Sequence, residues 1–303
     1  MSSVVVIGDA LIDELRDDAG GKEFVGGAAL NVAVGLSRLG VPTTLIAMVG
    51  DDEAGAKIRA YLDDYGVQLL ASPSPLGSSR AVSVRVDGEP TYVFNDAAQA
   101  RHLTFDEAQR AAIADADRIV VSCYPFDDAE QTAALIDAVG EASDRLVIDP
   151  NPRTGMMKDL DEFRRGFEAL ADGAGVVKIG DDDATLLYET DLDAAVTRMR
   201  ELGVPTVLAT RGAAGATLVT DPATVTKPVS SLPGAVTDTM GAGDASLAAL
   251  VAGIVQKDPT TADEWTDVLG TAMDIAAATC RFHGALLRTP DALADDHMDP
   301  IGT

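Results

Sequence analysis

The chain has 303 residues and a formal net charge of −26 at pH 7, from 49 acidic and 23 basic side chains, which argues against a polyanionic partner such as nucleic acid. We expect so negative a charge where high intracellular salt screens self-repulsion, and an ordinary acidic cytosolic protein is the alternative. Cys123 and Cys280 lie far apart and no apolar stretch reaches the ~18 residues of a membrane span, so we expect a cytoplasmic protein without a metal cluster, disulfide framework or transmembrane helix.

Short apolar runs alternate with helix-like segments along most of the chain. This alternation predicts βαβ units, a mostly parallel sheet with helices on both faces, and ligand binding beyond the carboxyl ends of the strands. We therefore predict one α/β domain over residues 1–303. The predicted strands are residues 4–7, 43–49, 119–122, 146–148, 176–179, 204–209 and 216–219, and the predicted helices are residues 31–39, 53–65, 129–142, 162–170 and 192–202.

One region departs from that alternation. Residues 79–94 alternate apolar and polar side chains across an Asp-Gly turn, which predicts a β-hairpin. Together with the extended residues 11–25, this hairpin could form a small sheet that acts as a lid, from about residues 11–25 and 79–96. The alternative is an extension of the main sheet at its edge.

Two glycines precede the first predicted helix. Gly26 and Gly27 would let a ligand approach the backbone, and Asn31 offers a donor and an acceptor in the first helical turn. An ordinary helix start explains the same residues. The segment lacks the G-x-G-x-x-G spacing of a dinucleotide site, and the chain contains no G-x-x-x-x-G-K-[S/T] sequence, which excludes a P-loop.

The second glycine segment, residues 238–244, reads Asp-Thr-Met-Gly-Ala-Gly-Asp and precedes an uncharged apolar run. That run predicts a buried helix beginning near residues 241–243, where free N–H groups and the helix dipole favour an anion such as phosphate. Asp244 would repel a bound phosphate unless it accepts a proton from an attacking hydroxyl, as phosphoryl transfer to an alcohol requires. The alternative is an acid that only suits the helix dipole.

These two segments resemble both signatures of the ribokinase-like (PfkB) carbohydrate kinases, in the same order and at the same separation. Residues 8–13, 149–153, 210–215 and 280–285 extend the resemblance over nearly the whole chain. It implies a three-layer αβα sandwich with a mostly parallel central sheet and a small β-sheet lid. It also implies an ATP-dependent kinase that transfers the γ-phosphoryl group to a sugar hydroxyl, with Mg²⁺ as cofactor. Residues 8–13, 92–94 and 280–285 look most like fructokinases.

The resemblance also implies roles for individual residues. Asp244 would be the general base, and the N–H groups of residues 241–243 would bind the transferring phosphoryl group. Asp183 would organise water around Mg²⁺, although the family's N-x-x-E element appears here as Gly180-Asp181-Asp182-Asp183. The remaining sites are the amide donors Gly241, Ala242 and Gly243, the sugar-site residues Asp13, Gly27, Asn31, Arg153 and Phe94, the nucleotide-site residues Thr210, Gly212, Gly215, Cys280 and Gly284, and Asp238 and Met240, which match a loop that in many members binds a monovalent cation, with K⁺ as the candidate ion.

Several alternatives stay open. Leu11 and Ala28 replace an Asn and a Lys that many ribokinases carry, which argues against ribose. A 2-keto-3-deoxygluconate kinase would need a cation for the substrate carboxylate, which Arg80 or Arg101 could provide. A nucleoside or riboside kinase would need an aromatic platform, such as Phe94 or its neighbour at position 92. A non-catalytic sugar-binding protein is a further class, and we expect any homodimer to form through the lid.

Overall fold

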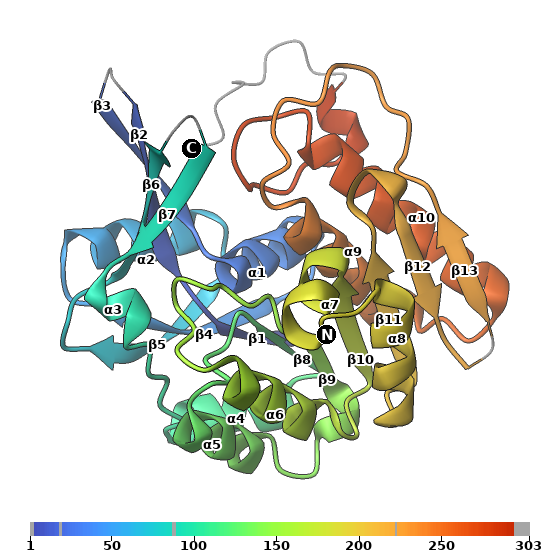
Figure 1. Cartoon of the computed structure of the whole chain (residues 1–303), viewed down its shortest axis with the longest axis horizontal. Helices are drawn as coiled ribbons and strands as arrows, with labels where there is room; N and C mark the ends of the chain where they lie inside the picture. The colour runs from blue at the N-terminus through green and yellow to red at the C-terminus, as the bar shows by residue number, and fades with distance from the viewer. Residues whose placement is uncertain (1–2, 18–19, 87–88, 222, 294–303) are drawn as a thin grey trace.

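The computed structural model describes residues 3–17, 20–86, 89–221 and 223–293. Its main feature is a nine-stranded sheet with the order β13-β12-β11-β10-β9-β8-β1-β4-β5 (Figure 1). The pairings from β5 to β11 are parallel, whereas β12 pairs antiparallel with both β11 and β13. The strands are β1 (Val4–Gly8), β4 (Thr43–Gly50), β5 (Gln68–Ser74), β8 (Arg118–Ser122), β9 (Leu146–Asp149), β10 (Val176–Gly180), β11 (Thr206–Thr210), β12 (Ala216–Val219) and β13 (Thr224–Lys227).

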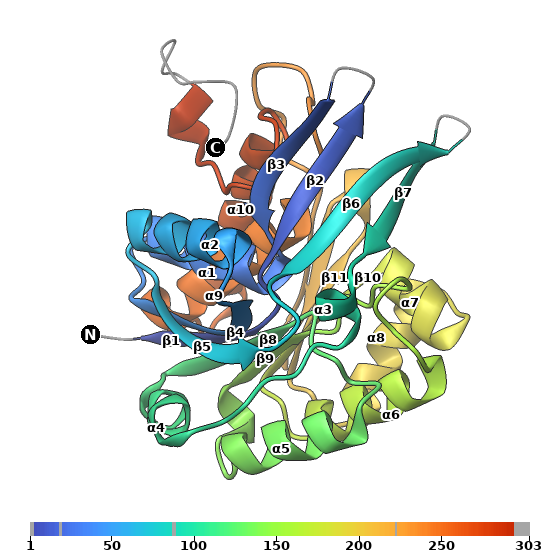
Figure 2. The same ribbon diagram turned by 90° about the vertical axis from the view of Figure 1, so that its left-hand side faces the viewer.

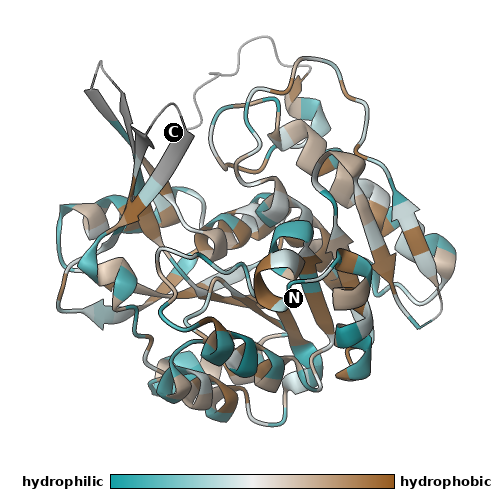
Figure 3. Cartoon of the chain, in the orientation of Figure 1, coloured by the Kyte–Doolittle hydropathy of each residue, from teal (hydrophilic) through white to brown (hydrophobic). Residues whose placement is uncertain are grey.

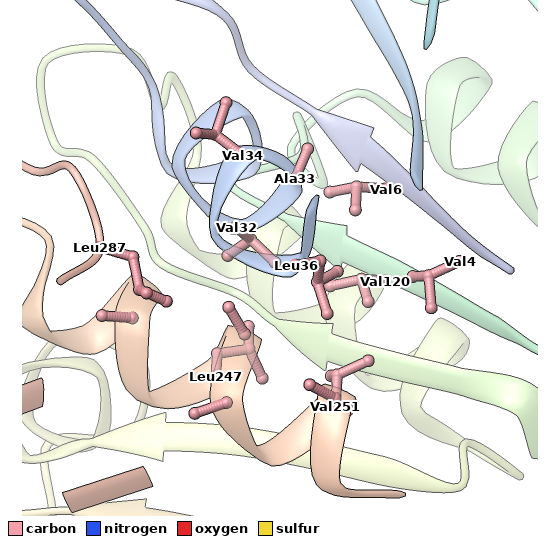
Figure 4. Packing of buried hydrophobic residues seen from close by; sticks show 14 of the residues in the cluster. Val4, Val6, Val32, Ala33, Val34, Leu36, Val120, Leu247, Val251 and Leu287 are labelled. Carbon is pink, nitrogen blue, oxygen red and sulfur yellow. The ribbon is translucent and has the colours of Figure 1, made fainter. Parts of the chain in front are cut away.

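Helices cover both faces of this sheet. Because side chains alternate along a strand, Val4 and Val6 of β1 pack under α1, α2, α9 and α10, whereas Val5 and Ile7 pack under the layer formed by α4 to α8. Figure 4 shows part of the first of these two cores, which includes Leu36 of α1, Leu247 of α9, and Val4 and Val120 of the sheet. The helices are α1 (Ala28–Arg38), α2 (Glu53–Asp64), α3 (Asp96–Gln99), α4 (Glu107–Asp115), α5 (Ala129–Val139), α6 (Leu160–Ala171), α7 (Asp181–Tyr188), α8 (Leu192–Glu201), α9 (Ala242–Lys257) and α10 (Ala262–Thr279).

A second, four-stranded sheet stands away from the main one (Figure 2). Its order is β3-β2-β6-β7, with β2 parallel to β6 and the other two pairs antiparallel. This small sheet combines the two predicted stretches and is not an extension of the main sheet, although the predicted turn at Asp87 and Gly88 lies outside the described residues. The strands are β2 (Leu11–Asp17), β3 (Gly20–Gly26), β6 (Ser79–Val86) and β7 (Glu89–Phe94).

The predicted α/β fold, with its mostly parallel sheet and small separate sheet, is confirmed. In Figure 3 apolar residues concentrate on the central strands, and polar residues on the outward surfaces of helices such as α5 and α6. No helix among the described residues is both long and apolar enough to cross a membrane.

The topology also determines where a site can form. The parallel strands end along one edge of the main sheet, at Gly8 of β1, Asp149 of β9, Gly180 of β10 and Thr210 of β11. The small sheet begins immediately after β1, and α1 begins immediately after β3. Segments that are distant in the sequence therefore meet at this edge.

Candidate active site

A cavity of about 910 Å³ lies at the carboxyl edge of the main sheet. It is bordered by the small sheet, the starts of α1 and α9, and the segment that follows β9. Its described lining comprises Asp9, Leu11, Asp13, Gly27, Ala28, Asn31, Ala81, Tyr92, Phe94, Asn151, Pro152, Arg153, Thr154, Gly155, Met156, Lys178, Asp182, Asp238, Thr239, Met240, Gly241, Gly243 and Asp244. Both glycine segments recognised in the sequence thus contribute to one cavity.

Asp244 lies in the first turn of α9 and faces this cavity. The amide Nδ2 of Asn31, in α1, donates a hydrogen bond of 2.8 Å to its Oδ2, across 213 positions of sequence. Burial raises the pKa of Asp244 to about 6, against the opposing effect of the Asn31 hydrogen bond. Such a carboxylate is ionised at neutral pH and basic enough to accept a proton from a bound hydroxyl.

In the backbone before Asp244, two of the three predicted N–H donors have no internal acceptor among the described residues. Gly241 has a φ of +74°, and a Cβ there would lie 2.6 Å from Cα of Ala285, so this position requires glycine. The N–H groups of Gly241 and Gly243 donate to no acceptor within the described part of the chain. Ala242 differs, because its N–H donates to the carbonyl of Thr239 at 3.3 Å and the residue does not line the cavity.

All five residues expected at the sugar site line the cavity: Asp13, Gly27, Asn31, Phe94 and Arg153. Burial and the nearby charge of Asp9 raise the pKa of Asp13 to about 7. Gly27 has a φ of +110°, and a Cβ there would lie 2.9 Å from the carbonyl oxygen of Asp9. The Phe94 ring packs so closely on Gly155 that a Cβ on this glycine would lie 2.6 Å from it.

Sequence reasoning missed a buried ion pair at the floor of the cavity. Lys178 of β10 donates a hydrogen bond of 2.9 Å from Nζ to Oδ2 of Asp149, at the end of β9, and their side chains are 8% and 0% exposed. Burial alone would lower the pKa of Lys178, but the charges of Asp149 and Asp183 raise it, so the ammonium stays protonated. In the sequence, the feature that could have indicated this ion pair is the single charged residue inside the apolar strand Val-Val-Lys-Ile-Gly.

The expected nucleotide-site residues lie outside the cavity just described. Thr210 ends β11 beside Gly180, and Gly212 begins the exposed turn Gly212–Ala214. Gly215 has a structural role, because its φ is +96° and a Cβ there would lie 2.1 Å from the carbonyl oxygen of Lys227. The carbonyl of Cys280 accepts the N–H groups of residues 237 and 238.

The Asp238 segment is hydrogen-bonded to the residues that follow α10. Asp238 accepts hydrogen bonds from the N–H of Met240 at 2.9 Å and from the N–H of Gly284 at 3.0 Å, one on each carboxylate oxygen. Asp238 and Met240, the residues expected to contact K⁺, line the cavity. Gly284 lies instead on a second, smaller cavity of about 540 Å³ behind β3, which Asp238 and Met240 also border.

Asp183 lies in the first turn of α7, where its Oδ2 accepts the N–H of Gly180 at 2.8 Å. Burial and the charge of Asp149 raise its pKa, against the effect of Lys178. The nearby carboxylate of Asp149 can accept a further hydrogen bond or bind a cation, because its Oδ1 is buried without a hydrogen-bond partner among the described residues. No group of three or more His, Cys, Asp or Glu in the described ranges is placed to hold a metal ion by itself, so any metal here would need ligands from water or substrate.

Residues 1–292 match the model of the pfkB family of carbohydrate kinases. A fructokinase from Rhizobium leguminosarum bv. trifolii is 32% identical over 262 residues, which cover 83% of this chain and 79% of the relative. The fold is similar to that of a fructokinase with bound ATP from Xylella fastidiosa, with a TM-score of 0.81, 20% identity and 94% of each chain covered. It is also similar to that of an aminoimidazole riboside kinase from Salmonella enterica, with a TM-score of 0.77, 24% identity and coverage of 97% of this chain and 99% of that one.

The family match spans almost the whole chain, and its two glycine segments converge on one cavity that holds Asp244. The chain therefore belongs to the pfkB family of carbohydrate kinases, and it is a phosphotransferase that acts on a hydroxyl group of a sugar.

Proposed function

We propose that this kinase transfers the γ-phosphoryl group of ATP to fructose. The observation that carries the proposal is the joint position of Asp244, held by Asn31, and the unpartnered N–H groups of Gly241 and Gly243 on one cavity wall. The 32% identity with a fructokinase supports fructose as the acceptor.

In the proposed reaction Asp244 takes the proton of the acceptor hydroxyl as the sugar oxygen forms a bond to the γ-phosphorus. The bond between that phosphorus and the β,γ-bridging oxygen breaks, and ADP leaves with the electron pair. Gly241 and Gly243 would donate N–H groups to the phosphoryl oxygens, where the positive end of the α9 dipole adds to the stabilisation. The proton on Asp244 then passes to solvent.

We assign the sugar to Asp13, Asn31, Arg153 and the backbone at Gly27, with Phe94 against its apolar face. The small sheet would act as a lid, because water competes with the sugar as a nucleophile and a covered site suppresses hydrolysis of ATP. The nucleotide would lie across the open surface bordered by Thr210, Gly212, Gly215, Cys280 and Gly284.

The carboxylate of Asp183 fits a hydrated Mg²⁺, because Mg²⁺ prefers oxygen ligands and retains several waters, and the unpartnered Oδ1 of Asp149 lies nearby. When bound, Mg²⁺ supplies neutralisation of the nucleotide phosphates. A K⁺ ion would contact Asp238 and the carbonyl of Met240 and would support the loop that precedes α9. Chelation of Mg²⁺ should abolish turnover, and replacement of K⁺ by Li⁺ should lower it.

The two arginines considered for a 2-keto-3-deoxygluconate carboxylate, Arg80 and Arg101, have other partners. Arg80 forms an ion pair of 2.6 Å with Glu23, and buried Arg101 donates a hydrogen bond to the carbonyl of Cys123. Neither arginine lines the cavity, so neither reaches a substrate carboxylate there. A riboside is the stronger second candidate, because Tyr92 lines the cavity with 43% of its surface exposed and could stack on a base.

The test is a panel of fructose, 2-keto-3-deoxygluconate, ribose and ribosides, each incubated with ATP and Mg²⁺ while ADP and the phosphorylated product are measured. We expect the highest kcat/KM with fructose. A higher value with a riboside would favour the second candidate. Binding of sugars without ADP formation would contradict catalysis and identify a sugar-binding protein.

A further inference from the structure

Lys178 occupies an unusual position for a lysine, since only 7% of the residue is exposed and it sits in the middle of an apolar strand. Its Nζ bonds to Asp149, yet the residue also borders the cavity. On the other side it lies against the start of α9: a Cβ placed on Gly243 would be 3.6 Å from Cε and 3.7 Å from Nζ of Lys178. The ammonium is therefore next to the N–H groups that form the anion site.

The charges around the cavity favour a cation at its floor. Among its described lining residues, five are aspartates and the positive charges come from Arg153 and Lys178. Arg153 belongs to the exposed segment after β9, whereas Lys178 is fixed at the floor. A transferring phosphoryl group carries negative charge on its equatorial oxygens, and Asp244 must be ionised beside it. A cation at the floor of the cavity would reduce that repulsion.

The hydrogen bonding of Lys178 is also incomplete. An ammonium has three N–H donors, and the described residues provide one acceptor, Oδ2 of Asp149. A lysine present only to neutralise Asp149 would be expected to find further acceptors or to lie away from the cavity, because buried polar groups are generally satisfied. The unused donors are instead available to a ligand at the cavity floor.

We propose that Lys178 is a further catalytic residue, whose ammonium binds a γ-phosphoryl oxygen beside Gly243 during transfer, and that Asp149 is the residue that positions it. The inference rests on the proposed kinase function and adds a cationic contact to the backbone anion site. It places the amides of Gly241 and Gly243 and this ammonium around the same migrating group, opposite the acceptor oxygen that Asp244 deprotonates.

Three variants separate catalysis from structural support: Lys178→Met, the double variant Lys178→Met/Asp149→Asn, and Lys257→Met as a control. Lys257 is exposed at the carboxyl-terminal end of the same helix α9, and its loss changes the net charge equally. For each protein we would measure Tm, kcat, KM, the Kd of ADP, and the Kd of ADP with aluminium fluoride and the sugar, which imitates the transferring phosphoryl group.

Lys178→Met should lose about 10²-fold or more in kcat, since a single phosphoryl donor in a preorganised site has an effect of this order. The Kd of ADP alone should change by less than about 3-fold, while binding of the aluminium fluoride complex should weaken about as much as kcat falls. Removing Lys178 leaves Asp149 buried and unpaired, so Tm should also fall. The double variant should recover Tm but not kcat, and Lys257→Met should match the wild type.

Recovery of kcat in the double variant would show that Lys178 only neutralises Asp149 and would overturn the inference. An unchanged kcat in Lys178→Met, or a loss confined to the Kd of ADP, would overturn it equally. If Lys178→Met does not fold, the double variant is compared with Asp149→Asn, and an equal kcat and an equal Kd of the aluminium fluoride complex in these two proteins would overturn the inference. These results leave the proposed function intact when the wild type phosphorylates sugar, whereas a wild type that phosphorylates no sugar contradicts the function and the inference together.

Discussion

Two regions border the same cavity, and they differ in how they are built. The floor consists of strand ends and helix starts, where charged groups such as Asp149 and Lys178 are buried and held by specific partners. The wall is the small sheet, where Tyr92 and Val93 are 43% and 54% exposed. Glu23 of β3 connects this sheet to α2 through an ion pair with Lys57, and it forms a second ion pair within the sheet, with Arg80 of β6. The floor is therefore suited to holding catalytic groups in fixed positions. The wall is suited to selecting the acceptor and excluding water.

The largest effect should come from the floor. Asp244→Asn keeps the size of the side chain but removes the base, so kcat should fall by about 10²- to 10⁴-fold with little change in nucleotide affinity. Asp258→Asn is the matched control at the other end of α9, where a φ of 44° suits Asn as well as Asp. Steady-state kinetics check both variants, and an Asp244→Asn enzyme that keeps most of its rate would remove this residue from the mechanism.

The pH dependence of kcat/KM should reflect the pKa of Asp244, which burial raises. Because the proposed base must be ionised to accept a proton, kcat/KM should fall about tenfold per pH unit below the pKa of about 6. The sign for stability is opposite. A folded-state pKa raised above the unfolded value means that the folded state binds more protons between about pH 4 and pH 6, so this group lowers the free energy of unfolding as pH rises through that range.

Asp244→Asn should therefore be more stable than the wild type at pH 7.5, by on the order of 3 kcal/mol, and this difference should vanish near pH 4. Thermal unfolding across this pH range measures it. A variant less stable than the wild type at pH 7.5 would show that the folded protein stabilises the ionised carboxylate, contrary to the raised pKa.

On the wall, Phe94→Ala should raise the KM for the sugar by about 10-fold and lower kcat by less than about 3-fold, because it removes apolar contact with the substrate and with Gly155. Val93→Ala is the control, since this neighbour points to the other face of the small sheet and does not line the cavity. Equal effects of the two variants would show that the sheet acts through its general stability.

The smallest effect should come from the connection between the small sheet and α2. Glu23→Gln removes two exposed ion pairs that each contribute about 0.2–1 kcal/mol, so the sugar KM should rise by about 2- to 5-fold. Hydrolysis of ATP in the absence of sugar should increase relative to transfer, since the covering sheet is held less firmly. Glu53→Gln is the control, because it removes another ion pair of Lys57 that does not involve the small sheet. It should leave the ratio of ATP hydrolysis to phosphoryl transfer unchanged.

The sequence predicted those parts of the molecule whose local pattern matches their final environment. Apolar runs indicated the central strands, and a glycine segment before an uncharged helix indicated the start of α9. β5 and α10 were not predicted, because apolar and polar residues are mixed in their sequences without a clear period. Each is defined by its packing: β5 pairs with β4, and α10 packs beside α9.

The site divides in the same way. Asn31 and Asp244 were recognisable from their own segments, although their contact across 213 positions was not. Lys178 was missed because its role depends on the register that places β10 beside β9 and hence Nζ beside Asp149. Ala242 was expected to donate its N–H to the phosphoryl group, but the local turn directs that N–H to Thr239. Turn geometry and strand register are products of the whole fold.

A crystal structure with fructose and a non-hydrolysable ATP analogue would test the roles of Asp244 and the α9 amides most directly. We expect one fructose hydroxyl within about 2.6–3.2 Å of a carboxylate oxygen of Asp244, with γ-phosphate oxygens about 2.7–3.1 Å from the N–H nitrogens of Gly241 and Gly243. A sugar whose hydroxyls all lie beyond hydrogen-bond reach of Asp244, or a γ-phosphate bound away from the start of α9, would contradict these roles.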